Sequence, residues 1–186
     1  MKLLIMGPPG VGKGTQADRI NNELMLVHLS TGEILRAEVD AKSVIGMNAK
    51  FYMDFGRLVP DNILIEIVKE RISKSDCQNG YILDGFPRTL PQAKGLDEMM
   101  NSIGHELEYA ISLTADKDEL VDRLIKRGKE SGRSDDTPDI IRNRQKIYWE
   151  QTAPLLDFYH DKGILKEVDG LGEISEITKR ILDVLK

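Results

Sequence analysis

The chain has 186 residues, 40% of them hydrophobic and 31% charged, which is ordinary for one soluble domain. Its formal net charge of -5 excludes a global positive field for nucleic acid, and its single cysteine excludes a disulfide framework and a Cys-based zinc site. No stretch approaches the roughly 20 apolar residues of a membrane span, and the apolar run 3–6 is too short for a signal sequence. We therefore expect a cytoplasmic protein without a nucleic-acid or membrane partner.

Short apolar runs alternate with helical patterns along most of the chain. Runs bounded by turn residues predict strands at 2–6, 27–29, 81–84, 109–113 and 164–168. The helical patterns cover 12–24, 61–74, 91–103, 116–126, 139–161 and 173–185. Such alternation is typical of an α/β fold, here a five-stranded parallel sheet with helices on both faces. Ligands of these sheets bind beyond the carboxyl ends of the strands, which is where we expect the site.

Two segments interrupt this alternation. Residues 30–59 contain no convincing strand, and we expect short helices there. Residues 128–138 read GKESGRSDDTP and are polar. We interpret both segments as excursions from a core domain.

A glycine-rich turn, GPPGVGKGTQ at residues 7–16, follows the first predicted strand and opens a helix. Its first seven residues fit G-x-x-x-x-G-K, in which backbone N–H groups, a helix N-terminus and the lysine, here Lys13, hold phosphates. Gly14 separates Lys13 from Thr15, so the hydroxyl of the strict pattern stands one residue late. The turn alone leaves a GTPase, an ATPase and a kinase open, beside a plain strand–helix turn with an exposed lysine.

The stretch GYILDGFPRT, residues 80–89, contains a buried-strand run that Asp84 ends. A carboxylate at the carboxyl end of a strand, beside a phosphate loop, is well placed to organise magnesium and its waters. A helix cap or turn carboxylate is the alternative. Arg88 follows a Phe–Pro bend in which Pro87 restricts the backbone, so a stiff turn sets the direction of Arg88. An arginine exposed to solvent is the alternative there.

Several arginines break or flank apolar helix faces. On a helical wheel for 139–161, Arg144 lies in the middle of the apolar stripe, whereas Arg142 points the opposite way, to solvent. Arg123 and Arg127 lie together on the flank of the preceding helix, and Arg133 follows in the polar segment. Because an inward charge is costly without a partner, these arginines predict a cleft that holds a phosphate chain. The alternative is a surface ion-pair network with Asp135, Asp136 and Asp139.

Seven motifs together resemble those of an adenylate kinase, in the order GPPGVGKGTQ, STGEILR, GRLVPD, GYILDGFPRT with Gln92, SGRSDD, RNRQKIY and VDG. The resemblance to this P-loop, nucleoside monophosphate kinase family covers essentially the whole chain, in its short-lid form. It implies a three-layer fold like that of P-loop NTP hydrolases. Its parts would be a core domain of residues 1–29, 60–126 and 138–186, a domain for the nucleoside monophosphate (NMP) at 30–59, and a short lid at 127–137.

The resemblance also implies an activity: reversible Mg²⁺-dependent transfer of a phosphoryl group, ATP + AMP = 2 ADP, directly in line. ATP, AMP and ADP would be the ligands, Mg²⁺ the cofactor, and adenine nucleotide homeostasis and nucleotide biosynthesis the role. A monomer is implied by analogy with short-lid members. The nearest alternative is a UMP/CMP-type kinase, and a more distant one is a nucleotide-dependent switch, although the chain has no N-K-x-D motif for guanine.

Site residues follow from the same resemblance. The catalytic set would be Lys13, Arg88, Arg127, Arg133, Arg144 and Asp84, the last holding Mg²⁺ through water. ATP would be bound by Gly10, Val11, Gly12, Lys13, Gly14, Thr15, Arg123, Arg127 and Gly172. AMP would be bound by Thr31, Arg36, Arg57, Leu58, Val59, Gly85, Phe86, Pro87, Arg88, Gln92, Arg133 and Arg144. Arg123 would stack on the adenine of ATP, and Gln92 would read the adenine of AMP.

Two features bear on specificity and closure. UMP/CMP relatives tend to carry Ala where this chain has Thr31, so Thr31 favours adenine. The lid segment is short and has no cysteine, so we expect a flexible loop without structural zinc, with backbone freedom from Gly128 and Gly132. The remaining candidates are interpreted as ordinary strand, surface or structural residues: His28, His105, His160, Cys77 and Trp149.

Overall fold

The computed structural model describes residues 1–131, 133 and 135–186, although not the side chains at 117 and 118. Five parallel strands form one sheet in the order β2-β3-β1-β4-β5. Their bounds are β1 Lys2–Met6, β2 Val27–Ser30, β3 Tyr81–Asp84, β4 Tyr109–Thr114 and β5 Leu165–Asp169. The prediction of a five-stranded parallel sheet is confirmed, and no strand end differs from its predicted position by more than one residue.

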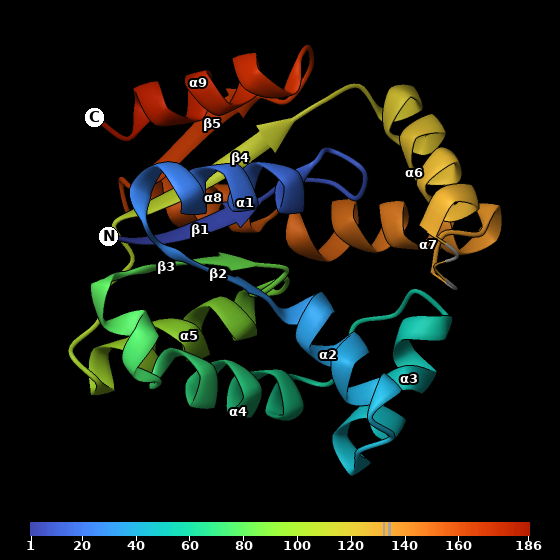
Figure 1. Ribbon diagram of the computed structural model, residues 1–186, viewed down its shortest axis with the longest axis horizontal. Coiled ribbons are helices and arrows are strands. Elements are labelled where there is room, and N and C mark those ends of the chain that lie inside the picture. Colours follow the sequence, from blue (N-terminus) through green and yellow to red (C-terminus); the bar gives the residue numbers. More distant parts are fainter. Residues whose placement is uncertain (132, 134) are drawn as a thin grey trace.

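Helices cover both faces of this sheet (Figure 1). Their bounds are α1 Lys13–Leu24, α2 Thr31–Asp40, α3 Val44–Asp54, α4 Asp61–Ile72, α5 Leu90–Ser102, α6 Lys117–Ser131, α7 Pro138–Ile147, α8 Leu155–Asp161 and α9 Ile174–Val184. A 3₁₀ turn at Ser75–Asn79 and a π-helical turn at Tyr148–Thr152 complete the described helical segments. None of the helices in the described ranges is long and apolar enough to cross a lipid bilayer.

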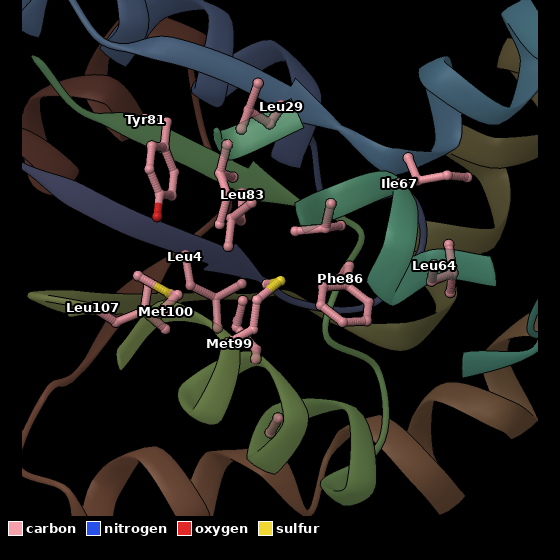
Figure 2. Close-up of a cluster of buried hydrophobic side chains, with 14 of the residues drawn as sticks. Leu4, Leu29, Leu64, Ile67, Tyr81, Leu83, Phe86, Met99, Met100 and Leu107 are labelled. Carbon is pink, nitrogen blue, oxygen red and sulfur yellow. The ribbon is translucent and has the colours of Figure 1, made fainter. Parts of the chain in front are cut away.

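The two faces of the sheet form two apolar cores because successive strand residues point to opposite sides. Leu4 and Met6 of β1 contribute to the cluster under α4, α5 and α8, and Leu3 and Ile5 contribute to the one under α1 and α9. Figure 2 shows the first cluster, in which Phe86 lies with strand residues such as Leu4. The carboxyl ends of β1 and β3 are thereby held rigidly, and the turns that follow them start from fixed points.

Residues 30–59 form the expected short helices, α2 and α3, which project to one side of the sheet (Figure 1). Each begins at a serine cap: the Ser30 hydroxyl accepts from Glu33 N–H at 3.3 Å, and the Ser43 hydroxyl accepts from Gly46 N–H at 2.9 Å. The far end of this pair contacts α7, where Asn143 Nδ2 donates to the carbonyl of Phe55 at 2.9 Å.

Helix α6 differs from its prediction, since it continues to Ser131 instead of ending at 126. Gly128 therefore lies inside a helix, not in a loop. A Cβ at Gly128 would lie 2.7 Å from the carbonyl oxygen of Asp136, so the glycine permits close approach of the chain at 136. Of the predicted lid, residues 127–131 are helical, and Gly132, the second proposed source of backbone freedom, lies outside the described residues.

The predicted helix 139–161 is interrupted by a π-helical turn at Tyr148–Thr152. Ala153 N–H donates to the carbonyl of Tyr148 at 2.8 Å, five residues back. Pro154 follows and has no N–H to continue a regular ladder, which favours the wider turn. The turn ends at Thr152, whose hydroxyl contacts the carbonyl of Arg88 in the turn after β3.

Candidate active site

A cavity of about 490 Å³ lies at the carboxyl ends of β1 and β3. Its walls come from the glycine-rich turn, the start of α2, the segment 56–59, the turn after β3, and helices α6 and α7. In Figure 1 these elements surround the right-hand side of the sheet. The predicted residues that line it are Gly10, Gly12, Lys13, Gly14, Thr15, Thr31, Arg36, Arg57, Leu58, Val59, Asp84, Gly85, Arg88, Arg123, Arg127, Arg133 and Arg144.

The glycine-rich turn forms the floor of this cavity. Gly10 has a φ of 92°, and a Cβ there would lie 2.8 Å from the carbonyl of Leu120, so only glycine fits without strain. The Lys13 ammonium donates to the carbonyls of Gly7 at 2.8 Å and Pro8 at 3.1 Å. Burial lowers the pKa of Lys13 to about 8, although the nearby Asp84 carboxylate favours its charged form.

Asp84 ends β3 and faces this lysine across the cavity floor. Burial opposes ionisation of its carboxyl group, but the His28 imidazole and the charge of Lys13 hold the pKa of Asp84 below its ordinary value. His28 Nε2 lies 3.5 Å from Asp84 Oδ2, and His28 Nδ1 lies 2.7 Å from Asp18 Oδ1. An ionised carboxylate with room for water and phosphate oxygens suits Mg²⁺, which takes few protein ligands. No cluster of three or more potential metal-binding side chains occurs in the described part of the chain.

Four arginines that were predicted to surround the phosphates line the cavity, and three of them pair with two carboxylates. Arg127 makes a two-point pair with Asp136, at 2.6 and 2.8 Å. Arg144 Nη1 lies 2.7 Å from Asp136 Oδ1 and 3.1 Å from Asp135 Oδ2. Arg133 Nε lies 3.5 Å from Asp135 Oδ1. These arginines therefore line a cleft and belong to an ion-pair network at once, whereas the sequence presented the two as alternatives.

Arg88 is the fourth arginine, and the turn after β3 holds it. Its Nε donates to the carbonyl of Gly85 at 2.7 Å, and Thr152 Oγ1 donates to the Arg88 carbonyl at 2.8 Å. Burial, with the like charge of Arg144, lowers the pKa of Arg88. The Phe86–Pro87 peptide bond within this turn is cis. The π-helical turn thus places Thr152 where it fixes the backbone that carries Arg88.

The outer arginines differ in what they contact. Arg123 Nη2 lies 2.5 Å from Glu119 Oε1 on the same helix. The Arg57 guanidinium lies 6.0 Å from the ring centre of Phe51 and 5.9 Å from that of Phe55, so it points toward α3. Because the side chain points toward α3, a contact of Arg57 with AMP would come from its backbone, and the predicted role in AMP binding stays a prediction. Arg142 is 76% exposed and pairs with Asp139, as the helical wheel indicated.

Thr31 and the turn after β3 meet in the wall of the cavity. The Thr31 side chain is buried, and its Oγ1 donates to the carbonyl of Asp84 at 3.3 Å. Leu58 and Val59 line the cavity nearby, together with Met53 and Leu64. This apolar wall next to a threonine hydroxyl has the composition of a pocket for a flat base.

Some predicted residues do not line this cavity. They are Val11, Phe86, Pro87, Gln92 and Gly172. Phe86 is fully buried in the core, and Pro87 lines a smaller adjoining cavity together with Lys13. The Gln92 side chain is fully buried: its Oε1 accepts from Arg88 N–H at 2.7 Å, and its Nε2 donates to Asp61 Oδ1 at 2.7 Å.

Sequence reasoning missed other residues of the site. His28 was interpreted as an ordinary strand residue, yet its side chain lies between Asp18 and Asp84. The available signal was its position two residues before the STGEILR motif. Asp135 was considered only as an ion-pair partner of the arginines, yet it lines the cavity. Other lining residues that were not predicted as site residues are Pro9, Asp18, Ser30, Gly32, Glu33, Leu35, Met53, Gly56, Leu64 and Leu124.

Comparison with known proteins agrees with this geometry. A family model described as adenylate kinase matches residues 5–164. The chain belongs to the adenylate kinase family. It is therefore a phosphotransferase, a nucleoside monophosphate kinase.

Bacterial adenylate kinases match the chain along its length. The protein of Nocardioides sp. is 48% identical over 185 residues, which cover 100% of this chain and 97% of the relative. The protein of Stenotrophomonas maltophilia is 46% identical over 186 residues and 100% of both chains. The protein of Leptospira biflexa is 49% identical over 181 residues, 97% of each chain. Nothing in these comparisons favours a UMP/CMP kinase.

Proposed function

We propose that this adenylate kinase transfers a phosphoryl group between ATP and AMP by direct in-line displacement, with Mg²⁺ as cofactor. The observation that carries the proposal is the convergence of Lys13, Arg88, Arg127, Arg133 and Arg144 on one cavity. These cations come from several walls of the cavity: the glycine-rich turn, the turn after β3, and the segment from α6 to α7. Such a placement suits two phosphate-bearing ligands that meet head to head.

Catalysis then rests on position and charge, since the AMP phosphate is already an anionic nucleophile. Lys13 and the glycine-rich turn hold the phosphates of ATP. Arg88, on its stiff turn, aligns the phosphate of AMP. Arg133 and Arg144 stabilise the negative charge of the group in transfer from the opposite side.

Magnesium fits the ionised carboxylate of Asp84. The ion would be held through water, with phosphate oxygens of ATP as its other ligands. It would neutralise charge on the phosphates during transfer. Within this chain, Asp84 supplies the carboxylate, and His28 and Lys13 favour its ionised form.

Closure would exclude water, because a wet phosphoryl group would be hydrolysed. We assign residues 30–59 to the NMP domain and 127–137 to the lid, around a core of 1–29, 60–126 and 138–186. The contact between Asn143 and the Phe55 carbonyl supports an approach of the NMP domain to α7. We further propose a cytoplasmic monomer that serves adenine nucleotide homeostasis and nucleotide biosynthesis.

The decisive experiment is a coupled assay for ADP formation. We expect ADP to appear only when both ATP and AMP are present with Mg²⁺, and much faster with AMP than with CMP or UMP. ADP formation from ATP alone would indicate a hydrolase. Equal rates with CMP would indicate the UMP/CMP-type alternative.

A further inference from the structure

Gln145 is a buried polar residue that the mechanism above does not use. It follows Arg144 on α7 and is 3% exposed. Its Nε2 donates to the carbonyl of Pro9, in the glycine-rich turn, at 3.1 Å. Its Oε1 is buried and has no hydrogen-bond partner within the described ranges. The side chain thus links two walls of the active site through one hydrogen bond.

This bond completes a pattern along the turn. The carbonyls of Gly7 and Pro8 accept from Lys13, and the next carbonyl, that of Pro9, accepts from Gln145. All three carbonyl oxygens are therefore engaged by donors of the protein. Such engagement matters because a free carbonyl oxygen that turned into the cavity would repel a phosphate.

The orientation of the Pro9 carbonyl also sets the direction of an N–H group. The Pro9–Gly10 peptide bond is trans, so the Pro9 carbonyl and the Gly10 N–H point in opposite directions. With the carbonyl drawn toward α7, the N–H of Gly10 points away from α7. Pro9 and Gly10 both line the cavity, and the Gly10 N–H makes no hydrogen bond to the rest of the described chain.

We propose that Gln145 is a positioning residue for the ATP half of the site. It holds the Pro9–Gly10 peptide so that the Gly10 N–H is ready to bind a phosphate oxygen. The proposal rests on the assignment of the triphosphate to this turn. Gln145 itself does not touch the nucleotide.

Because Gln145 is buried with an unsatisfied oxygen, an apolar substitution can distinguish a positioning role from a role in fold stability. A carboxamide with one unsatisfied buried oxygen stabilises a fold less than an apolar side chain of the same shape. Gln145→Met removes the donor and the unsatisfied oxygen together while it preserves length. A purely structural Gln145 would therefore leave catalysis unchanged in this variant.

The test compares Gln145→Met, and Gln145→Leu as a second variant, with the wild type. We expect KM for ATP to rise about tenfold, the factor for loss of one hydrogen bond to a charged group, and KM for AMP to stay within about twofold. Inorganic tripolyphosphate, titrated calorimetrically, should bind about tenfold more weakly, with Tm unchanged or raised.

A matched control is Tyr159→Phe. Tyr159 is fully buried on α8, outside the active site, and its hydroxyl has no hydrogen-bond partner in the part of the chain that the structure describes. The variant removes a buried, unsatisfied oxygen, so it should leave both KM values unchanged, with Tm unchanged or raised.

Unchanged KM for ATP and unchanged tripolyphosphate affinity in both Gln145 variants would overturn the proposal, as would an equal rise in both KM values. A wild type that forms no ADP from ATP and AMP would refute the proposed function. Weaker tripolyphosphate binding by the Gln145 variants would support the positioning role even then.

Discussion

Replacement of Arg88 by alanine tests the proposed mechanism most directly. The side chain lines the cavity, and its Nε donates to the Gly85 carbonyl at 2.7 Å. The backbone of Arg88 is held separately, by Gln92 at its N–H and by Thr152 at its carbonyl. Those two bonds do not involve the guanidinium. Arg88→Ala should therefore remove a charge from the site and leave the turn in place.

The two expected effects differ in size. A single arginine that stabilises a phosphoryl group in transfer contributes roughly 10³–10⁵ in rate, or about 4–7 kcal/mol of activation free energy. The loss in folding stability is bounded by one charge-assisted hydrogen bond, about 1.5–3 kcal/mol. It is reduced further because the variant no longer buries a charge beside Arg144. For a chain of this length, each kcal/mol lowers Tm by about 2–4 °C.

The measurement pairs kcat from the coupled ADP assay with Tm from thermal unfolding. Arg142→Ala is a matched control, because Arg142 is 76% exposed and its pair with Asp139 is a solvent-exposed contact. Such surface pairs contribute about 0–1 kcal/mol, so the control should keep both kcat and Tm.

Two results would refute the reasoning. Turnover of Arg88→Ala within tenfold of the wild type would remove Arg88 from the catalytic set. Loss of cooperative unfolding at the assay temperature would show that the guanidinium is needed for the fold, against the independent backbone bonds of the turn.

Three further predictions address the phosphate and base subsites. Lys13 is charged below its pKa of about 8 and neutral above it, so kcat/KM for ATP should fall about tenfold per pH unit above that pKa. Any residual activity of Lys13→Arg should not show this decline at alkaline pH. Thr31→Ala should lower the preference for AMP over CMP about fivefold, measured as the ratio of kcat/KM values; an unchanged ratio would remove Thr31 from base recognition. Asp61 accepts from Gln92 Nε2, so Asp61→Ala, which removes this acceptor, should raise KM for AMP about threefold and leave KM for ATP unchanged, whereas equal changes would contradict a role through Gln92.

Most of the site was predictable because two local signals coincide at one edge of a parallel sheet. The glycine-rich turn follows β1 and Asp84 ends β3, and these strands pair in parallel with Ile5 beside Asp84. The carboxyl ends of neighbouring parallel strands lie at the same edge of the sheet, so the glycine-rich turn and the Asp84 carboxylate necessarily line the same cavity. Helical periodicity was a separate signal, and it indicated correctly that the Arg144 side chain points inward, where it lines the cavity.

The missed features depend on contacts between segments far apart in the chain. His28 reaches Asp84 because β2 pairs with β3, and the alternation of strands and helices does not give strand order. Helix α6 passes through Gly128 because Asp136 packs against it, and this contact outweighs the low helix propensity of glycine. The π-helical turn was not predictable from a wheel of 100° per residue, which assumes regular geometry throughout.

The paired carboxylates of Asp135 and Asp136 explain how so many arginines coexist before a nucleotide arrives. Asp136 is fully buried as a side chain, and although burial opposes its ionisation, Arg127 and Arg144 hold its pKa below its ordinary value. Each carboxylate neutralises cations that would otherwise repel one another in a partly buried site. Asp135 lines the cavity and pairs with Arg133 and Arg144, so under the proposed function an incoming phosphate would meet guanidinium groups that are already oriented. The ion-pair network and the proposed phosphate site would thus be one structure, in which the carboxylates orient the arginines toward the transferred group.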